Sequence, residues 1–442
     1  MVYSIVYDFA IMSFLIFISQ LIKSKVGFFS KFFIPTSVIA GTIGLISGPY
    51  MLNIFSFSEE ASSYSYLLVV ILFAGLFLGR REKVKMKSML SEVGDTFCLN
   101  MAAEVGGFAS ALLIGGGFMA IAFPEINRGF ALLLPAGFTG GHGYAAAIGG
   151  TFENMGGWDE AITIGQTFAT IGILTAIFGG ILLINLNKKS IKAENILQER
   201  DSFADVDEKE AAGYITTNPI TLDSFTWHTS LLLCAAGIGF VLEKLWNTYG
   251  ADFELPLMCL TMLGGLILQF FLNKTKYSKF VDKETINRLS GITTDFLVAF
   301  GIATINVQVV TKYIVPIIIL AILGTAYAVF HTMVICKKLY SDYSFERSIF
   351  IFGWITGVVA MGITLLRVVD PNNKSKTIDD YGFAYILISV IELGLVAFLP
   401  VLVINGQGMI AGAVLAIAYV CLVFAAKIIK DKGHNKYEGL EK

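Results

Sequence analysis

Two short stretches combine glycine with threonine, and one of them also carries a histidine. These residues are Thr139, Gly140, Gly141, His142 and Gly143 in the first stretch, and Thr356 and Gly357 in the second. Glycine disfavours continuous helix, and a broken helix leaves backbone N–H and C=O groups unpaired. The N–H ends suit a carboxylate, whereas free carbonyl oxygens suit Na⁺. The pattern therefore predicts a site for a small anion and a cation, unless the glycines serve only close helix packing.

Ionisable and polar residues inside apolar stretches form a second group of candidates. An ionisable residue in a membrane span costs about 2.5–3.5 kcal/mol on insertion scales, so each is a functional candidate. Arg367 could clamp a substrate carboxylate through two parallel hydrogen bonds, or it could form an ion pair with Asp370. Glu104 is a further acid, within the apolar run 95–123. Candidate Na⁺ ligands are Glu392, Asp295, Gln166 and Thr167. The alternatives are a pairing with Arg367 for Glu392, the membrane interface for Asp295, and helix bridging for Gln166 and Thr167.

The composition places these residues in a membrane protein. The chain has 442 residues, of which 55% are hydrophobic and 15% are charged, against about 25% charged in soluble domains. This excludes most soluble enzymes and nucleic-acid binders. A membrane-spanning helix needs about 20 apolar residues. The expected spans are 4–22, 34–54, 62–79, 95–123, 160–187, 228–248, 255–273, 290–311, 313–336, 382–403 and 406–426.

Two further apolar segments, 129–150 and 348–366, are interrupted by the glycine-containing stretches. We expect each to be a re-entrant hairpin that leaves the membrane on the side where it enters. With the N-terminus outside and the C-terminus inside, 28 of the 32 Lys and Arg residues then fall on the inner side. This agrees with the positive-inside rule and predicts an integral protein of the cytoplasmic membrane.

Three sequence matches at nearly one offset predict an internal repeat. Ile34-Pro35 matches Leu255-Pro256, Thr139-Gly140 matches Thr356-Gly357, and Ile184-Asn185 matches Ile404-Asn405, at offsets of 221, 217 and 220. Because each half contains five spans, an odd number, the second half should be inverted. The predicted fold is an all-α polytopic membrane protein with two inverted-topology repeats of five transmembrane helices, each with a re-entrant hairpin, plus one extra C-terminal helix. The expected parts are 1–187, a cytoplasmic linker 188–226, 227–405, and a C-terminal helix and tail 406–442.

Inverted repeats with broken helices are typical of secondary transporters. A membrane-embedded enzyme is the main alternative from another class, but neither HExxH nor GxSxG occurs, so no enzyme is predicted. A channel is also less favoured, because no filter sequence or ring of charge is visible.

The chain resembles the glutamate:Na⁺ symporter family in three passages. They are FFIPTSVIAGTIG at 32–44, TGGHGYAAAIGGTFENMGG at 139–157 with ATIGILTAIFGG at 169–180, and FELPLMCLTMLGGLIL at 253–268. The resemblance implies Na⁺-driven uptake of L-glutamate by an elevator motion in a lipid-embedded homodimer. It implies Na⁺ as the co-transported ion, with no organic cofactor and no nucleic-acid partner. Another small carboxylate or amino acid is the alternative substrate, because the second hairpin differs from the Gly- and Ala-rich tip of well-known members.

Overall fold

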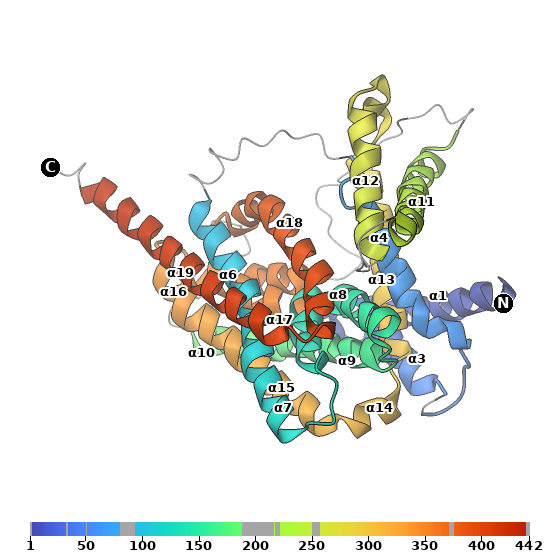
Figure 1. The fold of residues 1–442 in the computed structure, drawn as a ribbon, viewed down its shortest axis with the longest axis horizontal. Helices are drawn as coiled ribbons and strands as arrows, with labels where there is room; N and C mark the ends of the chain where they lie inside the picture. Colours follow the sequence, from blue (N-terminus) through green and yellow to red (C-terminus); the bar gives the residue numbers. More distant parts are fainter. Residues whose placement is uncertain are drawn as a thin grey trace. The chain divides into compact units, whose positions relative to one another are not determined.

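The computed structural model describes residues 2–31, 34–49, 51–79, 93–187, 216, 222–249, 257–370 and 375–438. All regular elements within these ranges are helices (Figure 1). Most of the predicted linker 188–226 lies outside the described residues. The chain divides into two compact units, Met1–Lys83 with Arg200–Asn306, and Val84–Glu199 with Val307–Lys442.

The first unit takes three main helices from each half of the chain. Its N-terminal part holds α1 (Val2–Lys25), α2 (Gly27–Lys31), α3 (Thr36–Ser47), η1 (Glu59–Ser63) and α4 (Tyr64–Gly75). Its second part holds α11 (Ser224–Tyr249), α12 (Leu257–Asn273), η7 (Lys276–Phe280) and α13 (Lys283–Ala303). Helix α12 packs closely on α11 and α4, because Gly264 and Gly265 leave no side chain between the backbones. Helix α13 packs on α3 and α4.

The second unit holds all the sequence-predicted site residues except Asp295. Its first part comprises α6 (Gly94–Ser110), η2 (Ala111–Gly115), α7 (Gly116–Ala122), η3 (Phe130–Leu132), α8 (Leu133–Gly156), α9 (Ala161–Leu174), η4 (Thr175–Gly179) and α10 (Gly180–Leu186). Its second part comprises α14 (Val307–Lys312), α15 (Ile314–Val329), η8 (Phe330–Cys336), α16 (Lys337–Leu339), α17 (Ser344–Val369), α18 (Thr377–Ile404) and α19 (Gly408–Glu438). Helices α8 and α17 lie side by side near the centre of this unit (Figure 1).

The two parts of the second unit follow a similar order of elements. The long helix with a π-helical turn comes first in the first part (η2), whereas in the second part it follows the short helix α14 (η8). A helix with an internal break (α8 or α17) follows. A long helix that packs against a broken helix comes next, namely α9 continuing into α10, and α18, after which the second part adds α19.

The described helices confirm an all-helical membrane protein but differ from the expected spans. Eight helices are long and apolar enough to cross a membrane. Seven of them correspond to predicted spans, and the eighth, Ser344–Val369, contains the segment 348–366. Three expected spans, 34–54, 62–79 and 255–273, contain shorter apolar helices.

The expected span 290–311 is wrong as one continuous helix. Helix α13 ends at Ala303, and α14 begins separately at Val307. The Thr304 hydroxyl donates to the Phe300 carbonyl at 2.8 Å, which satisfies an acceptor at this helix end. Apolarity continues past the break, so hydropathy alone did not detect it.

Candidate functional site

The first glycine-containing stretch forms a sharp reversal inside α8. Gly141 has φ 59° and ψ −152°, a conformation that is essentially open to glycine alone. At the other end of the segment, the Gly129 backbone lies on the Phe152 ring, so closely that a Cβ at Gly129 would be 2.5 Å from the ring. The beginning and the end of the segment therefore lie together, and the chain between them forms a helical hairpin.

The second stretch reverses α17 in the same way. Gly357 and Val358 leave the helical region, with Val358 at φ 67° and ψ 168°. A Cβ at Gly353 would lie 2.7 Å from the Gly362 backbone. In a straight helix, nine residues would separate these positions by about 13 Å. Helix α17 is thus also a hairpin, although its length and apolarity alone would allow it to span a membrane.

The tips of the two hairpins touch. A Cβ on Gly141 would lie 2.5 Å from Cγ1 of Val358. The Thr139 hydroxyl donates to the Ile355 carbonyl at 3.5 Å. Thr356 is fully buried, and its hydroxyl donates to the Phe352 carbonyl of its own arm at 2.6 Å. Thr139 and Thr356, which are 217 residues apart in the sequence, therefore belong to one buried contact.

Helix α9 supports the first tip through a short chain of hydrogen bonds. The Thr170 hydroxyl donates to the Gln166 carbonyl at 2.9 Å, so its oxygen is left to accept from Nε2–H of His142 at 3.2 Å. Nδ1 of a neutral His142 then remains an acceptor. The Gln166 amide donates to the His142 carbonyl at 3.2 Å, while its Oε1 is buried without a hydrogen-bond partner.

The other predicted site residues lie apart from this contact. Thr167 is buried and donates to the Thr163 carbonyl at 2.7 Å. Arg367 is exposed in the last turn of α17, nine residues beyond Val358. Asp370 is buried and accepts from the Ser375 N–H at 2.8 Å. The structure does not bring Arg367 or Asp370 to the tips, and a carboxylate clamp by Arg367 stays a prediction.

The two acidic Na⁺-ligand candidates lie in different units. Asp295 is exposed on α13 of the first unit. Glu392 is buried on α18 of the second unit. It accepts a hydrogen bond from Tyr144, and the ring of Tyr144 covers the backbone of Gly140.

Sequence reasoning did not single out Thr170, Tyr144 or Val358 as parts of the site. Thr170 could have been found, because it lies one helical turn after Gln166 and so on the same face of α9. Nothing in the sequence distinguishes Val358 from its neighbour Val359, because its role depends on the backbone reversal.

The space at the tips is small. A cavity of about 20 Å³ borders Thr139 and Ile355, with Ser110 and Tyr327 on its other walls. This is room for about one water molecule.

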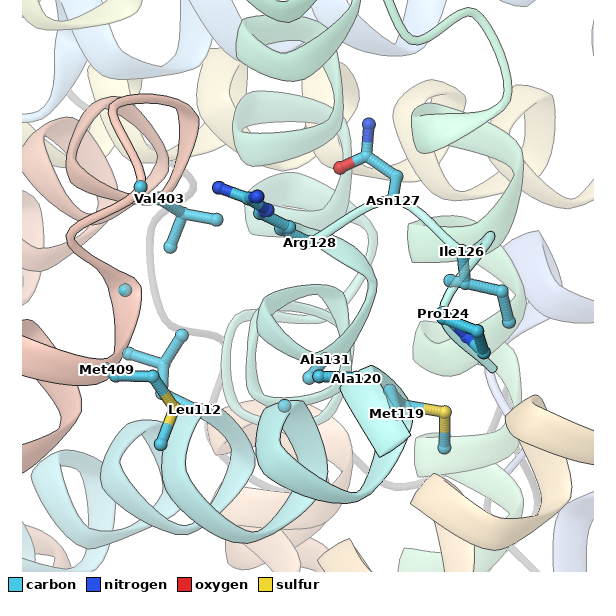
Figure 2. Close-up of a pocket in the computed structure, with 13 residues that line it drawn as sticks. Leu112, Met119, Ala120, Pro124, Ile126, Asn127, Arg128, Ala131, Val403 and Met409 are labelled. Atoms are coloured by element: carbon cyan, nitrogen blue, oxygen red, sulfur yellow. The ribbon is translucent and has the colours of Figure 1, made fainter. Parts of the chain in front are cut away.

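A larger cavity of about 370 Å³ lies elsewhere in the second unit (Figure 2). It is formed by α7, the segment that follows α7, and the turn between α18 and α19. Its lining is mainly apolar, and the Arg128 side chain extends into it toward Val403. Because none of the predicted site residues lines it, this cavity is distinct from the contact between the tips.

Comparisons with known proteins identify the family of this chain. A family model for the sodium/glutamate symporter matches residues 1–364, which include both hairpin tips and the helices of the first unit. A comparison with curated proteins gives no significant match. The matched range covers most of the chain. This protein is therefore an integral membrane protein that belongs to the sodium/glutamate symporter family.

Proposed function

We propose that this protein takes up L-glutamate together with Na⁺ across the cytoplasmic membrane by alternating access. Membership of the family supports both cargo species. The observation that carries the proposal for this chain is the buried contact between the two hairpin tips, at Gly141 and Val358. Broken helices that meet inside a membrane protein are the usual place for substrate and ion sites in secondary transporters.

The residues at the tips have the chemistry that an amino-acid zwitterion requires. Backbone N–H groups that follow the break at Gly141 begin a new helical arm and favour a carboxylate. The hydroxyl of Thr139 and the imidazole of His142 supply further hydrogen-bonding groups. The free Oε1 of Gln166 is an oxygen acceptor that suits the substrate ammonium or Na⁺.

The proposed topology places both hairpins as re-entrant segments from opposite faces of the membrane, with the N-terminus outside and the C-terminus inside. The similar order of elements in the second unit supports an internal repeat. We further propose that this unit, which holds both hairpins, moves as the transport domain, while the first unit forms the scaffold of a homodimer.

Membrane energetics set a minimum for the coupling ratio. Moving one negative charge inward against an inside-negative potential costs about 2.3 kcal/mol per 100 mV. One Na⁺ only cancels the charge of glutamate, so uptake that is driven by the potential requires at least two Na⁺ per substrate.

Uptake of radiolabelled glutamate into proteoliposomes that contain the purified protein tests the proposed function. We expect saturable uptake under an inward Na⁺ gradient and none when choline replaces Na⁺. Unlabelled L-glutamate should compete more strongly than other amino acids, dicarboxylates or hydroxycarboxylates. If a different carboxylate inhibits Na⁺-dependent uptake more strongly than L-glutamate does, that carboxylate replaces glutamate as the proposed cargo. Glutamate flux without Na⁺ would contradict the symport.

A further inference from the structure

Glu104 is a buried carboxyl group without any hydrogen-bond donor. It lies on α6, is 0% exposed, and has neither Oε1 nor Oε2 hydrogen-bonded. Burying an isolated carboxylate is so costly that buried charges in proteins are paired or coordinate metal ions. The Glu104 side chain therefore points to a partner that the polypeptide itself does not provide.

Glu392 is the neighbour of Glu104 in the unit core. It is 3% exposed on α18, which packs on both α6 and α8, and the two carboxyl groups interact electrostatically. Its Oε2 also has no hydrogen-bond partner, although the residue accepts from Tyr385 and Tyr144. Three carboxylate oxygens in this pair are thus free of donors.

No basic side chain among the described residues neutralises this pair. The ion pairs of the described chain join Lys312 to Glu160, and Arg347 to Asp342 and Asp380. Among the described residues, the other titratable groups that interact with the two carboxyls are tyrosines of α8, α15 and α18. They are Tyr144, Tyr327, Tyr381 and Tyr385. A bound cation would neutralise the pair, and a shared proton is the competing source of positive charge.

Tyr144 connects the pair to the tip of the first hairpin. It lies three residues after Gly141, and its ring packs on the Gly140 backbone. Its hydroxyl donates to Glu392. A cation that changes the position of Glu392 would therefore act on the hairpin tip through one side chain.

We infer that Glu104 and Glu392 form a binding site for one co-transported Na⁺, which Tyr144 links to the hairpin tip. Carboxylate and hydroxyl oxygens are the hard ligands that such an ion requires. The choice of Na⁺ rests on the proposed function. Glu392 lies beyond the range of the family match, so the pair is argued from this chain's own structure.

Na⁺-dependent thermal stability of the purified full-length protein tests the site without a transport assay. A ligand that binds only the folded state raises the unfolding temperature according to its concentration and affinity. In a choline background, wild-type protein should be stabilised by added Na⁺. Glu104→Gln and Glu392→Gln should each raise the half-maximal Na⁺ concentration at least tenfold. Without Na⁺, Glu104→Gln should be at least as stable as wild type, because it removes an uncompensated buried charge.

Glu153→Gln is a matched control. Glu153 is an acid on α8, the first hairpin, and its carboxylate accepts from the Ile162 N–H at 3.2 Å. Its Na⁺ response should equal that of wild type. Tyr144→Phe keeps the ring over Gly140 and should retain Na⁺ binding while weakening Na⁺-dependent glutamate uptake. If Glu104→Gln does not fold, Glu392→Gln provides the same measurement.

Three results have distinct meanings. An unchanged Na⁺ response in both glutamine variants would overturn the site. An unchanged Na⁺ response with a flattened pH dependence of stability would overturn it in favour of a shared proton. If the variants lose the Na⁺ response while the wild-type protein takes up no glutamate, the site is supported and only the proposed cargo is contradicted.

Discussion

At the scale of single residues, the reversal at each tip depends on backbone conformations that few side chains tolerate. Gly141 adopts φ 59° with ψ −152°, and Val358 adopts φ 67° although it is β-branched. Glycine adopts such a conformation freely, whereas for a β-branched residue it costs about 1–3 kcal/mol, and such outliers are concentrated at functional sites. Val358 is in direct contact with Gly141, which places its strain at the point where the cargo is proposed to bind.

Gly141→Ala should destabilise the protein by about 1–3 kcal/mol, because alanine is strained at this conformation. Its Cβ would also meet the Val358 side chain. The measurement is the thermal unfolding of purified protein. Gly143→Ala is the control for stability, since a Cβ there has no neighbour within 4 Å. Equal unfolding temperatures of the two variants would contradict the described reversal.

Sequence reasoning identified part of the tip chemistry at this scale. Two Thr-Gly pairs and the His142 stretch pointed to the segments that the structure brings together. The pairing of Glu104 with Glu392 could not be predicted, because it depends on how α6 and α18 are rotated toward each other. The exposure of Arg367 was also beyond prediction, since an apolar run does not reveal which face of its last turn is covered.

At the scale of elements, the two arms of α17 cross at glycines. Gly353 faces the backbone of Gly362 at a distance that excludes any side chain. Gly353→Ala should therefore force the arms apart at a cost of about 1–3 kcal/mol, the usual range for overpacking. Denaturant or thermal unfolding would measure this loss.

Gly394→Ala, on the neighbouring helix α18, is the matched control, because its Cβ has no neighbour within 4 Å. This substitution should be neutral or stabilising, since alanine favours helix. A stable Gly353→Ala variant would indicate that α17 is a continuous helix and not a hairpin.

An ion pair joins the start of α9 to the end of α14. Glu160 accepts from Lys312 at 2.8 Å and from the Tyr313 hydroxyl at 2.6 Å. Partial burial alone would raise the pKa of Glu160, but the hydrogen bonds from Lys312 and Tyr313 outweigh it and hold the pKa below its ordinary value. The pair therefore stabilises the fold above the unfolded-state pKa of about 4.3, and this contribution is lost as the pH falls through the lower pKa of the folded state.

Glu160→Gln should accordingly lower the unfolding temperature at neutral pH and have progressively less effect below about pH 4. Unfolding temperatures of wild type and variant across this pH range would measure the effect. Glu125→Gln, which changes an exposed acid in the second unit, should leave the unfolding temperature unchanged at every pH. If the unfolding temperatures of Glu160→Gln and wild type differ by the same amount at every pH, the charge of Glu160 contributes nothing to the stability of the fold.

The elements themselves were partly predictable. Length and apolarity were sufficient for helices such as α1, α15 and α19. They were insufficient for 34–54, where the helix begins only after Pro35 and ends at Ser47. The reversals inside α8 and α17 were predictable because glycine is placed where the helices break.

At the scale of the whole molecule, the division of the chain does not follow its halves. Each compact unit takes helices from before and after the predicted linker. Repeat matches in the sequence indicated two halves, but they could not show which helices of the two halves pack together. Both hairpins belong to one unit, which is the arrangement that a common cargo site requires.

An imposed membrane potential tests the charge balance of the transport cycle. An inside-negative potential, generated with K⁺ and valinomycin in proteoliposomes, should accelerate Na⁺-dependent glutamate uptake, because at least two Na⁺ accompany each glutamate. Uptake that does not respond to the potential would refute this coupling ratio and indicate electroneutral transport.

The central claim is that the cargo binds where the hairpin tips meet, and cross-linking tests it most directly. A Thr139→Cys and Ile355→Cys pair, in protein whose native cysteines are replaced by serine, should be joined by a short bifunctional thiol reagent. The Glu160→Cys and Lys312→Cys pair is the control, because those side chains lie 2.8 Å apart away from the tips. We predict that Na⁺ with glutamate slows cross-linking of the tip pair and leaves the control pair unchanged. If the tip pair is not cross-linked, or is cross-linked equally fast with and without cargo, binding of the cargo between the tips is contradicted.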